Sequence, residues 1–240
     1  MENFPLVFDF KLFGIDFPIT LAIVEQWVIM LAIIIFVLLL TRKLETIPKG
    51  IQVWGEVIVE TINNVVKSIM GEKFEHFAPY IGTIMIYLLI MNLFGLTGFE
   101  PPTTDYSIAL SLAIVSFVII QVTAIRHNGF GHYLTAYAKP IWPLAPLNLI
   151  ERFVVPVSLS LRLFGNMFAA SILMELIHGF LYGGSKLLHL GIFGENLHFG
   201  IFQIGIPLVF NAYFDVFDGG IQMVIFSMLT MIFIKTTTEH

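Results

Sequence analysis

Arg162 is the residue of this chain with the strongest chemical signal, because it is a charged side chain within the apolar segment VSLSLRLFGNMFAA. Predominantly apolar helix is expected on both sides of it, which places its guanidinium deep in a membrane. A charge there costs between about 3 and more than 10 kcal/mol on competing scales, and an arginine cannot lose its proton. One explanation is structural, with the side chain reaching the membrane surface or pairing with a buried carboxylate. The mid-helix position favours the other, a functional cation.

Polar residues of the same segment can be placed around Arg162 by helical geometry, at about 100° and 1.5 Å per residue. Asn166 lies one turn further on and close to the same face. Glu151 lies on a similar face, about 16 Å nearer the start of the helix. Ser171 and Glu175 fall on nearly the opposite face, toward the other end. Polar groups are therefore expected on both sides of the arginine along the helix.

The last apolar segment carries a matching polar stripe, whose members follow one another at spacings of four, three and four and so share a helix face. They are Asn211, Asp215, Asp218 and Gln222. If this helix packs antiparallel to the first, with Gln222 level with Arg162, its carboxylates would meet the hydroxyl of Ser171. A chain of carboxylates inside a membrane is what a hydrated proton or cation path requires. Alternatively, Asp215 and Asp218 cap or hydrogen-bond a bend of the helix.

Other chemistries have weaker support. His178 follows Glu175 at the Glu-x-x-His spacing of some bundle metal sites, but a di-iron carboxylate site needs a second copy and further glutamates, so we predict no metal. No glycine is followed by Lys-Ser/Thr in the phosphate-binding pattern, and we predict no direct nucleotide binding. A net charge of −5 does not suggest a nucleic-acid partner. The absence of cysteine excludes disulfides and thiolate sites.

The composition is that of an integral membrane protein, with 57% hydrophobic residues, 12% charged residues and a mean hydropathy of +0.88. A helix needs roughly 20 mostly apolar residues to cross a bilayer. Five stretches meet this test, at about 17–41, 77–99, 106–125, 147–181 and 197–234. The last two are long enough that they must tilt, bend or protrude. We predict an all-α membrane protein in which these two spans form a long tilted antiparallel hairpin.

A further helix is predicted at about 50–70, where apolar residues recur at spacings of three and four and charged residues hold the opposite face. This pattern favours an amphipathic helix lying in the membrane interface; a soluble helix packed on other protein is the alternative. No long internal repeat or low-complexity linker interrupts the chain, so residues 1–240 are interpreted as a single membrane domain.

Basic residues are distributed unevenly when the loops are assigned to alternate sides. Nine lie on one side: Arg42, Lys43, Lys49, Lys67, Lys73, Arg126, Lys139, Arg152 and Lys235. Two, Lys11 and Lys186, lie on the other. Because cytoplasmic loops retain Lys and Arg, we expect the N-terminus outside and the C-terminus in the cytoplasm.

Two segments resemble a known family. LSLRLFGNMFA, from Leu159 to Ala169, is similar to the signature of subunit a of bacterial F-type ATP synthases. GIQMVIFSMLTMIFI, from Gly220 to Ile234, is similar to the last helix of that family, with Gln222 at its glutamine position. The number of spans, the surface helix and the exterior N-terminus agree with the family, although the N-terminal half matches by architecture more than by motif.

The resemblance implies a function and partners. A chain of this family is a non-catalytic stator subunit of the bacterial plasma membrane, and it works with a ring of c subunits, the b subunits of the peripheral stalk and the rest of the ATP synthase. Two half-channels open to opposite sides of the membrane, offset along the ring. Arg162 would attract each ring carboxylate and prevent direct leakage, so that H⁺ or Na⁺ flow drives rotation and ATP synthesis. No cofactor is implied beyond the translocated ion.

The resemblance also assigns individual residues. Asn166 and Gln222 match amides near the arginine, and Glu151 matches an acidic position on the cytoplasmic path. Many bacterial members carry a glutamate at the position of Ser171, and Glu175, one turn on, is its candidate substitute. Asp215 stands where some relatives have histidine, which makes the outer path acidic.

Two other functions have less support in the sequence. A stand-alone secondary transporter would use Arg162 to hold an anionic substrate, but it predicts inverted repeats and paired broken helices, which the sequence lacks. A membrane di-metal oxidoreductase would use Glu175 and His178, but it lacks the second motif.

Overall fold

The computed structural model describes residues 6–12, 15–42, 44–97, 99, 101–129, 131, 145–187, 209–210 and 212–239. Within them, five helical stretches are long and apolar enough to cross a membrane, which confirms the predicted all-α membrane architecture. They are Leu21–Thr41, Glu72–Thr97, Tyr106–Asn128, Ile150–Leu181 and Tyr213–Thr238. The prediction of the fifth span began earlier, at 197, on residues outside the described ones.

A short β-hairpin precedes the first span. Strand β1, Leu6–Leu12, pairs antiparallel with β2, Ile15–Thr20. Apolar and polar residues alternate through Phe8-Asp9-Phe10-Lys11 and Ile15-Asp16-Phe17, the period-two pattern of a strand. The predicted first span includes residues 17–20, because their hydropathy continues into α1, Leu21–Thr41. The helix therefore begins four residues later than predicted.

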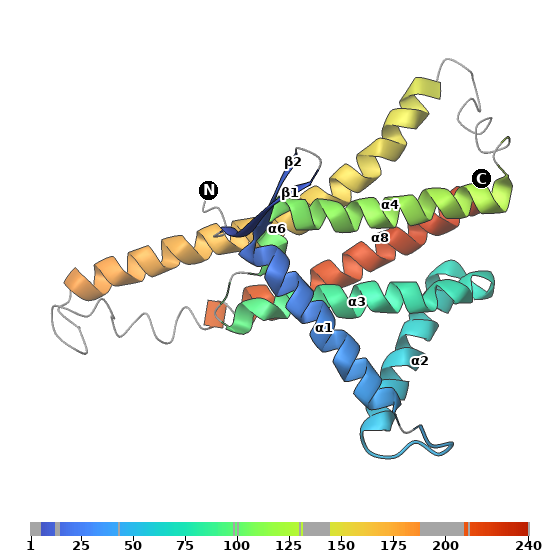
Figure 1. Cartoon of the computed structure of the whole chain (residues 1–240), viewed down its shortest axis with the longest axis horizontal. Helices are drawn as coiled ribbons and strands as arrows, with labels where there is room; N and C mark the ends of the chain where they lie inside the picture. Colours follow the sequence, from blue (N-terminus) through green and yellow to red (C-terminus); the bar gives the residue numbers. More distant parts are fainter. Residues whose placement is uncertain are drawn as a thin grey trace.

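Three helices form the central layer, which Figure 1 shows running roughly parallel: α3 (Ala78–Leu93), α4 (Tyr106–Asn128) and α8 (Gly219–Glu239). The second span also includes the 3₁₀ segments η1, Glu72–Phe77, and η2, Phe94–Thr97. A shorter 3₁₀ turn, η3, Pro102–Thr104, leads into α4. Polar contacts join the layer inside the membrane span, since the Tyr80 hydroxyl lies 3.1 Å from Ser116 Oγ.

Helix α4 has clear local signals at both ends. The side chain of Asp105 accepts a hydrogen bond from the Ser107 amide at 2.8 Å, as an N-cap does. At the other end Gly129 has a φ of 76°, which glycine adopts without steric cost, and its amide bonds the carbonyl of Ile125. The helix is thereby held to the length of one membrane crossing.

Helix α6, Ala145–Leu187, crosses this layer obliquely and runs opposite to α8, as predicted for the last two spans (Figure 1). Its main packing partner is α4. Buried Ala109 and Ala113 of α4 face Leu159 and Leu163 in one cluster. Small residues on one helix let the other approach closely, which is how helices associate in a membrane. This packing fixes the part of α6 that carries Arg162.

Helix α2, Ile51–Met70, confirms the amphipathic helix predicted at 50–70. Its second half buries Ile62, Val66 and Met70 against α3 and α8. Its first half leaves Trp54 and Ile58 exposed, together with other apolar residues. Its position in the membrane interface stays a prediction.

Candidate functional site

Arg162 lies near the middle of the membrane-spanning part of α6. At 1.5 Å per residue it is about 18 Å from Ile150 and about 28 Å from Leu181, the two ends of that span. Its side chain is partly buried. Among the described residues it forms neither an ion pair nor a hydrogen bond, so no carboxylate of that part of the chain neutralises it. Its charge is available to a partner.

The two amides predicted near Arg162 meet each other. Asn166 Nδ2 donates a hydrogen bond to Gln222 Oε1 at 2.9 Å, which joins α6 to α8. Gln222 is only 1% exposed, and its Nε2 is buried without an acceptor in the described part of the chain. Asn166 is one turn from Arg162, so this bridge sets the distance and rotation of α8 relative to the arginine. A buried amide donor without a protein acceptor marks a place for water or another polar group.

Asp215 and Asp218 lie in a π-helical segment, η5, Tyr213–Asp218, directly before α8. The wider turn changes which residues face the core, and it places Asp215 inside, at 8% exposure, while Asp218 is partly buried. Such segments are frequently found at functional sites. The prediction assumed regular helical spacing through this region.

Asp215 lies so close to η2 that a side chain at Gly95 would displace its carboxylate. A Cβ added at Gly95 would lie 2.7 Å from both carboxylate oxygens of Asp215 and 2.8 Å from its Cγ. Real Cβ atoms do not approach so closely. The structure sets Asp215 against the end of the second span; the contact of its carboxylate with Ser171 of α6 stays a prediction. Ser171 Oγ bonds the carbonyl of Phe168 in its own helix, at 2.9 Å.

A second polar cluster adjoins this carboxylate and was missed by sequence reasoning. Asn92 is fully buried; its Nδ2 donates to the carbonyl of Gly219 at 3.1 Å, and its Oδ1 accepts from Thr103 Oγ1 at 3.2 Å. Gly219 is equally confined, because a Cβ there would lie 2.7 Å from Asn92 Cβ. The only available signal was an asparagine within the apolar run YLLIMNLFG.

The remaining predicted residues lie on the surface of α6. Glu151 is exposed near its beginning and Glu175 toward its end. His178 Nδ1 is 2.9 Å from the carbonyl oxygen of Met174, one turn back. Asn211 lies outside the described residues. Sequence reasoning also missed the link between α4 and α6 in which Arg152 Nη1 donates to Gln121 Oε1 at 3.4 Å.

No metal centre is evident among the described residues, where no three His, Asp or Glu side chains come together as ligands. Glu175 and His178 are thus not part of such a cluster. The site consists of one unneutralised cation, an amide bridge and a buried carboxylate on neighbouring helices.

Comparison of the sequence with known proteins assigns the chain to a family. The sequence model described as ATP synthase A chain matches residues 23–235. This chain belongs to that family. It is 36% identical over 224 residues to ATP synthase subunit a of Trichlorobacter lovleyi, covering 91% of this chain and 87% of the relative. It is 33% identical over 224 residues to ATP synthase subunit a of Geobacter sulfurreducens, covering 91% and 88%.

A third relative is the sodium ion specific ATP synthase subunit a of Propionigenium modestum, 28% identical over 251 residues, covering 98% of this chain and 80% of the relative. Membership of the subunit a family and the five apolar spans together define a multi-pass membrane protein. As a subunit a, the chain is an ion-channel component of an ATP synthase complex and not a catalytic subunit. Arg162, Asn166 and Gln222 all lie within the matched region.

Proposed function

We propose that this chain is the stator of a rotary ion motor, in which Arg162 holds the ionised carboxylate of each passing subunit of a c ring. The observation that carries the proposal is the position of Arg162 in the middle of a membrane span, with no carboxylate paired to it in the described part of the chain. Leaving such a charge unneutralised in a membrane costs several kcal/mol. A negative group on a neighbouring rotor removes that cost.

The attraction is strong enough to act as a barrier against leakage. Two unit charges about 4 Å apart attract by about 4 kcal/mol at an effective dielectric of 20. A ring carboxylate beside Arg162 is therefore held ionised, and it cannot carry a proton or Na⁺ directly past the arginine. The ion must leave on one side of Arg162 and enter on the other, and ring rotation connects the two.

Two half-channels supply those ions. We assign Asp215, Asp218, Asn211 and Ser171 to the outer one, with Glu175 and His178 on the surface of α6 toward the same end. Glu151 belongs to the inner one, near the beginning of α6. Burial of Asp215 against η2 supports its assignment, because a carboxylate held inside a span can bind and release an ion where bulk water is excluded.

The bridge between Asn166 and Gln222 keeps α8 in register with Arg162. We propose that Gln222 Nε2, which lacks an acceptor in the described part of the chain, binds water at the point where the outer half-channel reaches the ring. The bridge thus has a positioning role and one in hydrating the ring carboxylate.

The transported ion is H⁺ or Na⁺, and no cofactor is required. Carboxylates serve either ion, and a relative from Propionigenium modestum is named as sodium ion specific. We expect the residues around the ring carboxylate to determine which of the two ions is transported.

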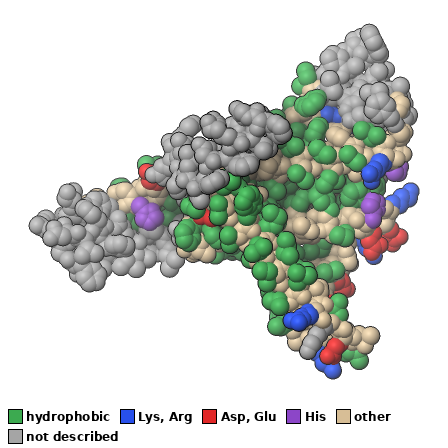
Figure 2. Space-filling model, in the orientation of Figure 1, with side chains coloured by type: hydrophobic (Ala, Val, Ile, Leu, Met, Phe, Trp, Pro, Cys, Tyr) green, Lys and Arg blue, Asp and Glu red, His purple; other side chains and the backbone are tan. Residues whose placement is uncertain are grey.

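The partners and orientation follow from the family role and the charge distribution. We propose that the c ring, the b subunits of the peripheral stalk and the bilayer surround this chain in a bacterial plasma membrane. On the face that Figure 2 shows, Lys and Arg side chains lie toward the right-hand end of the molecule and at its lower tip, where α1 leads into α2. Near the junction of α2 and η1, Lys67 pairs with Glu75 at 3.1 Å, and Lys235 donates to the carbonyl of Ile69 at 3.2 Å. We assign the side of the membrane with these basic residues to the cytoplasm, which places the N-terminus outside.

Substitution of the arginine tests the proposal. In inverted membrane vesicles holding the complete ATP synthase, Arg162→Ala should abolish ATP-driven ion pumping and ATP synthesis, because no charge then holds the ring carboxylate. Nucleotide hydrolysis by the detached catalytic part should be unchanged. Arg126→Ala, which removes an exposed cation from the last turn of α4, is the matched control and should pump normally. Coupled pumping by Arg162→Ala would refute the role.

A further inference from the structure

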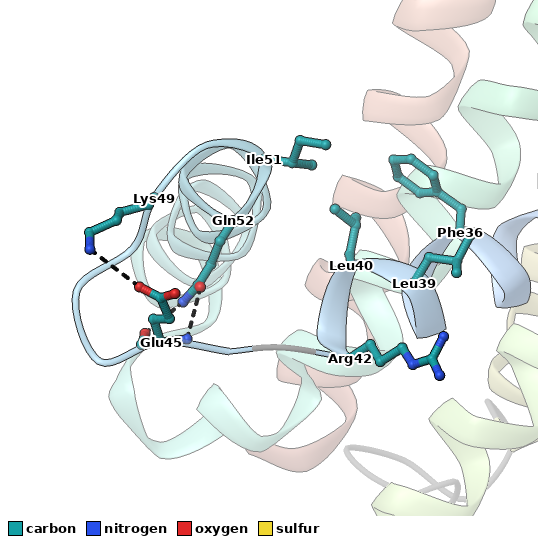
Figure 3. Close-up of a pocket in the computed structure, with 8 residues that line it drawn as sticks. All are labelled: Phe36, Leu39, Leu40, Arg42, Glu45, Lys49, Ile51 and Gln52. Carbon is teal, nitrogen blue, oxygen red and sulfur yellow. Dashed lines mark hydrogen bonds and ion pairs between the residues drawn. The ribbon is translucent and has the colours of Figure 1, made fainter.

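A cavity of about 730 Å³ lies far from Arg162, between the end of α1 and the beginning of α2. One wall is apolar, formed by Phe36, Leu39 and Leu40 of α1 and Ile51 of α2. Figure 3 shows Ile51 pointing across the space toward Leu40 and Phe36. Phe36 and Leu39 are 60% and 63% exposed. The cavity therefore has a lipophilic side that opens to the surroundings of α1.

The other side of the cavity is polar and structurally fixed. Gln52 Nε2 donates to the carbonyl of Glu45 at 2.9 Å, and the Glu45 amide donates to Gln52 Oε1 at 3.0 Å. Lys49 Nζ lies 3.5 Å from Glu45 Oε2. These contacts, visible as dashed lines in Figure 3, fold the linking segment against the first turn of α2. They also neutralise Glu45.

Among the described residues of the lining, Arg42 is the remaining charged group, and no described neighbour neutralises it. Its side chain extends away from the pair of Glu45 and Lys49 (Figure 3), and it forms no ion pair or hydrogen bond within the described residues. The charged residues of the lining that the structure describes are two cations and one anion, so this part of the lining carries a net positive charge. An exposed guanidinium that presents parallel N–H donors suits a phosphate group.

The length of α1 places the cavity at the level of the lipid headgroups in the bilayer. Helix α1, Leu21–Thr41, is about 32 Å long at 1.5 Å per residue, close to the bilayer core of about 30 Å. Arg42 directly follows its last residue and so lies at the level of the phosphates. Phe36 and Leu39 lie one to two turns deeper, among the acyl chains. A soluble phosphate would use the basic side and leave the apolar wall uncovered.

We propose that this cavity binds one anionic phospholipid, with its phosphate on Arg42 and an acyl chain against Phe36, Leu39 and Ile51. Basic pockets beside membrane helices recognise anionic headgroups in this way. The lipid would fill the space between α1 and α2 and so hold α2 against the bilayer surface. This inference does not depend on the role of Arg162.

The test uses the complete ATP synthase in nanodiscs that contain a photoactivatable lipid, either phosphatidylglycerol or phosphatidylethanolamine, with the reactive group near the glycerol. We expect phosphatidylglycerol to label residues 36–52 about fivefold more than phosphatidylethanolamine, the ratio that one basic residue near the membrane surface supplies. Arg42→Gln should reduce the labelling to the level of the zwitterionic probe. Arg126→Gln, at an exposed cation outside the cavity, should leave it unchanged.

Two results would overturn the proposal: equal labelling of residues 36–52 by the two lipids, or unchanged labelling of Arg42→Gln by phosphatidylglycerol. ATP-driven ion pumping by the same preparations in sealed vesicles shows that each variant has assembled. If Arg42→Gln does not assemble, the ratio between the two probes in the unmodified complex still decides the question.

Discussion

Replacing Gly95 with alanine would place a methyl group where the carboxylate of Asp215 now lies. The added Cβ would be 2.7 Å from both carboxylate oxygens, and the carboxylate must retreat by about 0.8 Å to restore a van der Waals contact of about 3.5 Å. Such a displacement is accommodated by a side-chain torsion outside its preferred well, at about 0.5 to 1.5 kcal/mol. If Asp215 holds ions in the outer half-channel, the ion-pumping rate should fall by about 2-fold to 12-fold.

The lower pumping rate of Gly95→Ala would result from the displaced carboxylate of Asp215 and not from a change in the backbone. Gly95 lies in a 3₁₀ segment and has no positive φ, so alanine is compatible with its conformation. ATP-driven pumping in inverted vesicles is the assay. Gly55→Ala is the control, because Gly55 lies inside α2 with nothing within 4 Å of an added Cβ. It should pump at the normal rate.

A double-mutant cycle gives the decisive comparison. In an Asp215→Ala background the carboxylate is gone, so Gly95→Ala should cause no further loss, since neighbouring residues that act through one contact are not additive. Normal pumping by Gly95→Ala would refute the reasoning. The same fractional loss in both backgrounds would also refute it, because Gly95 would then act independently of Asp215.

Two further predictions concern the same path. Asp215→Asn and Glu175→Gln should each slow ATP-driven pumping less severely than Arg162→Ala, because a hydrated path tolerates the loss of one carboxylate; unchanged rates in both variants would mean that the outer half-channel is elsewhere. Gln222→Leu should slow pumping in vesicles. Adding Asn166→Leu to that variant should lower the rate little further, because both substitutions remove the same hydrogen bond. Additive losses would show that the two amides act separately.

The sequence was sufficient for features that depend on local composition. The spans could be predicted because hydrocarbon excludes unpaired backbone groups, so that length and hydropathy alone identify helices that cross it. The depth of Arg162 followed from the apolar residues on either side of it. The amphipathic helix α2 followed from spacings of three and four. The hairpin of β1 and β2 was missed although its alternation was visible, because the hydropathy of residues 17–20 continues into α1.

The surroundings of each polar residue were decided by tertiary structure alone. Asp215 lies against Gly95, and Asn92 bonds Gly219, across more than a hundred residues of chain. No spacing rule links positions so distant, and glycines that make room for a neighbour look in the sequence like any other glycine. The π-helical turn at Tyr213–Asp218 also departs from the regular helical spacing that the sequence pattern assumes. Local composition determines which residues enter the membrane, whereas packing between distant helices determines which of them meet.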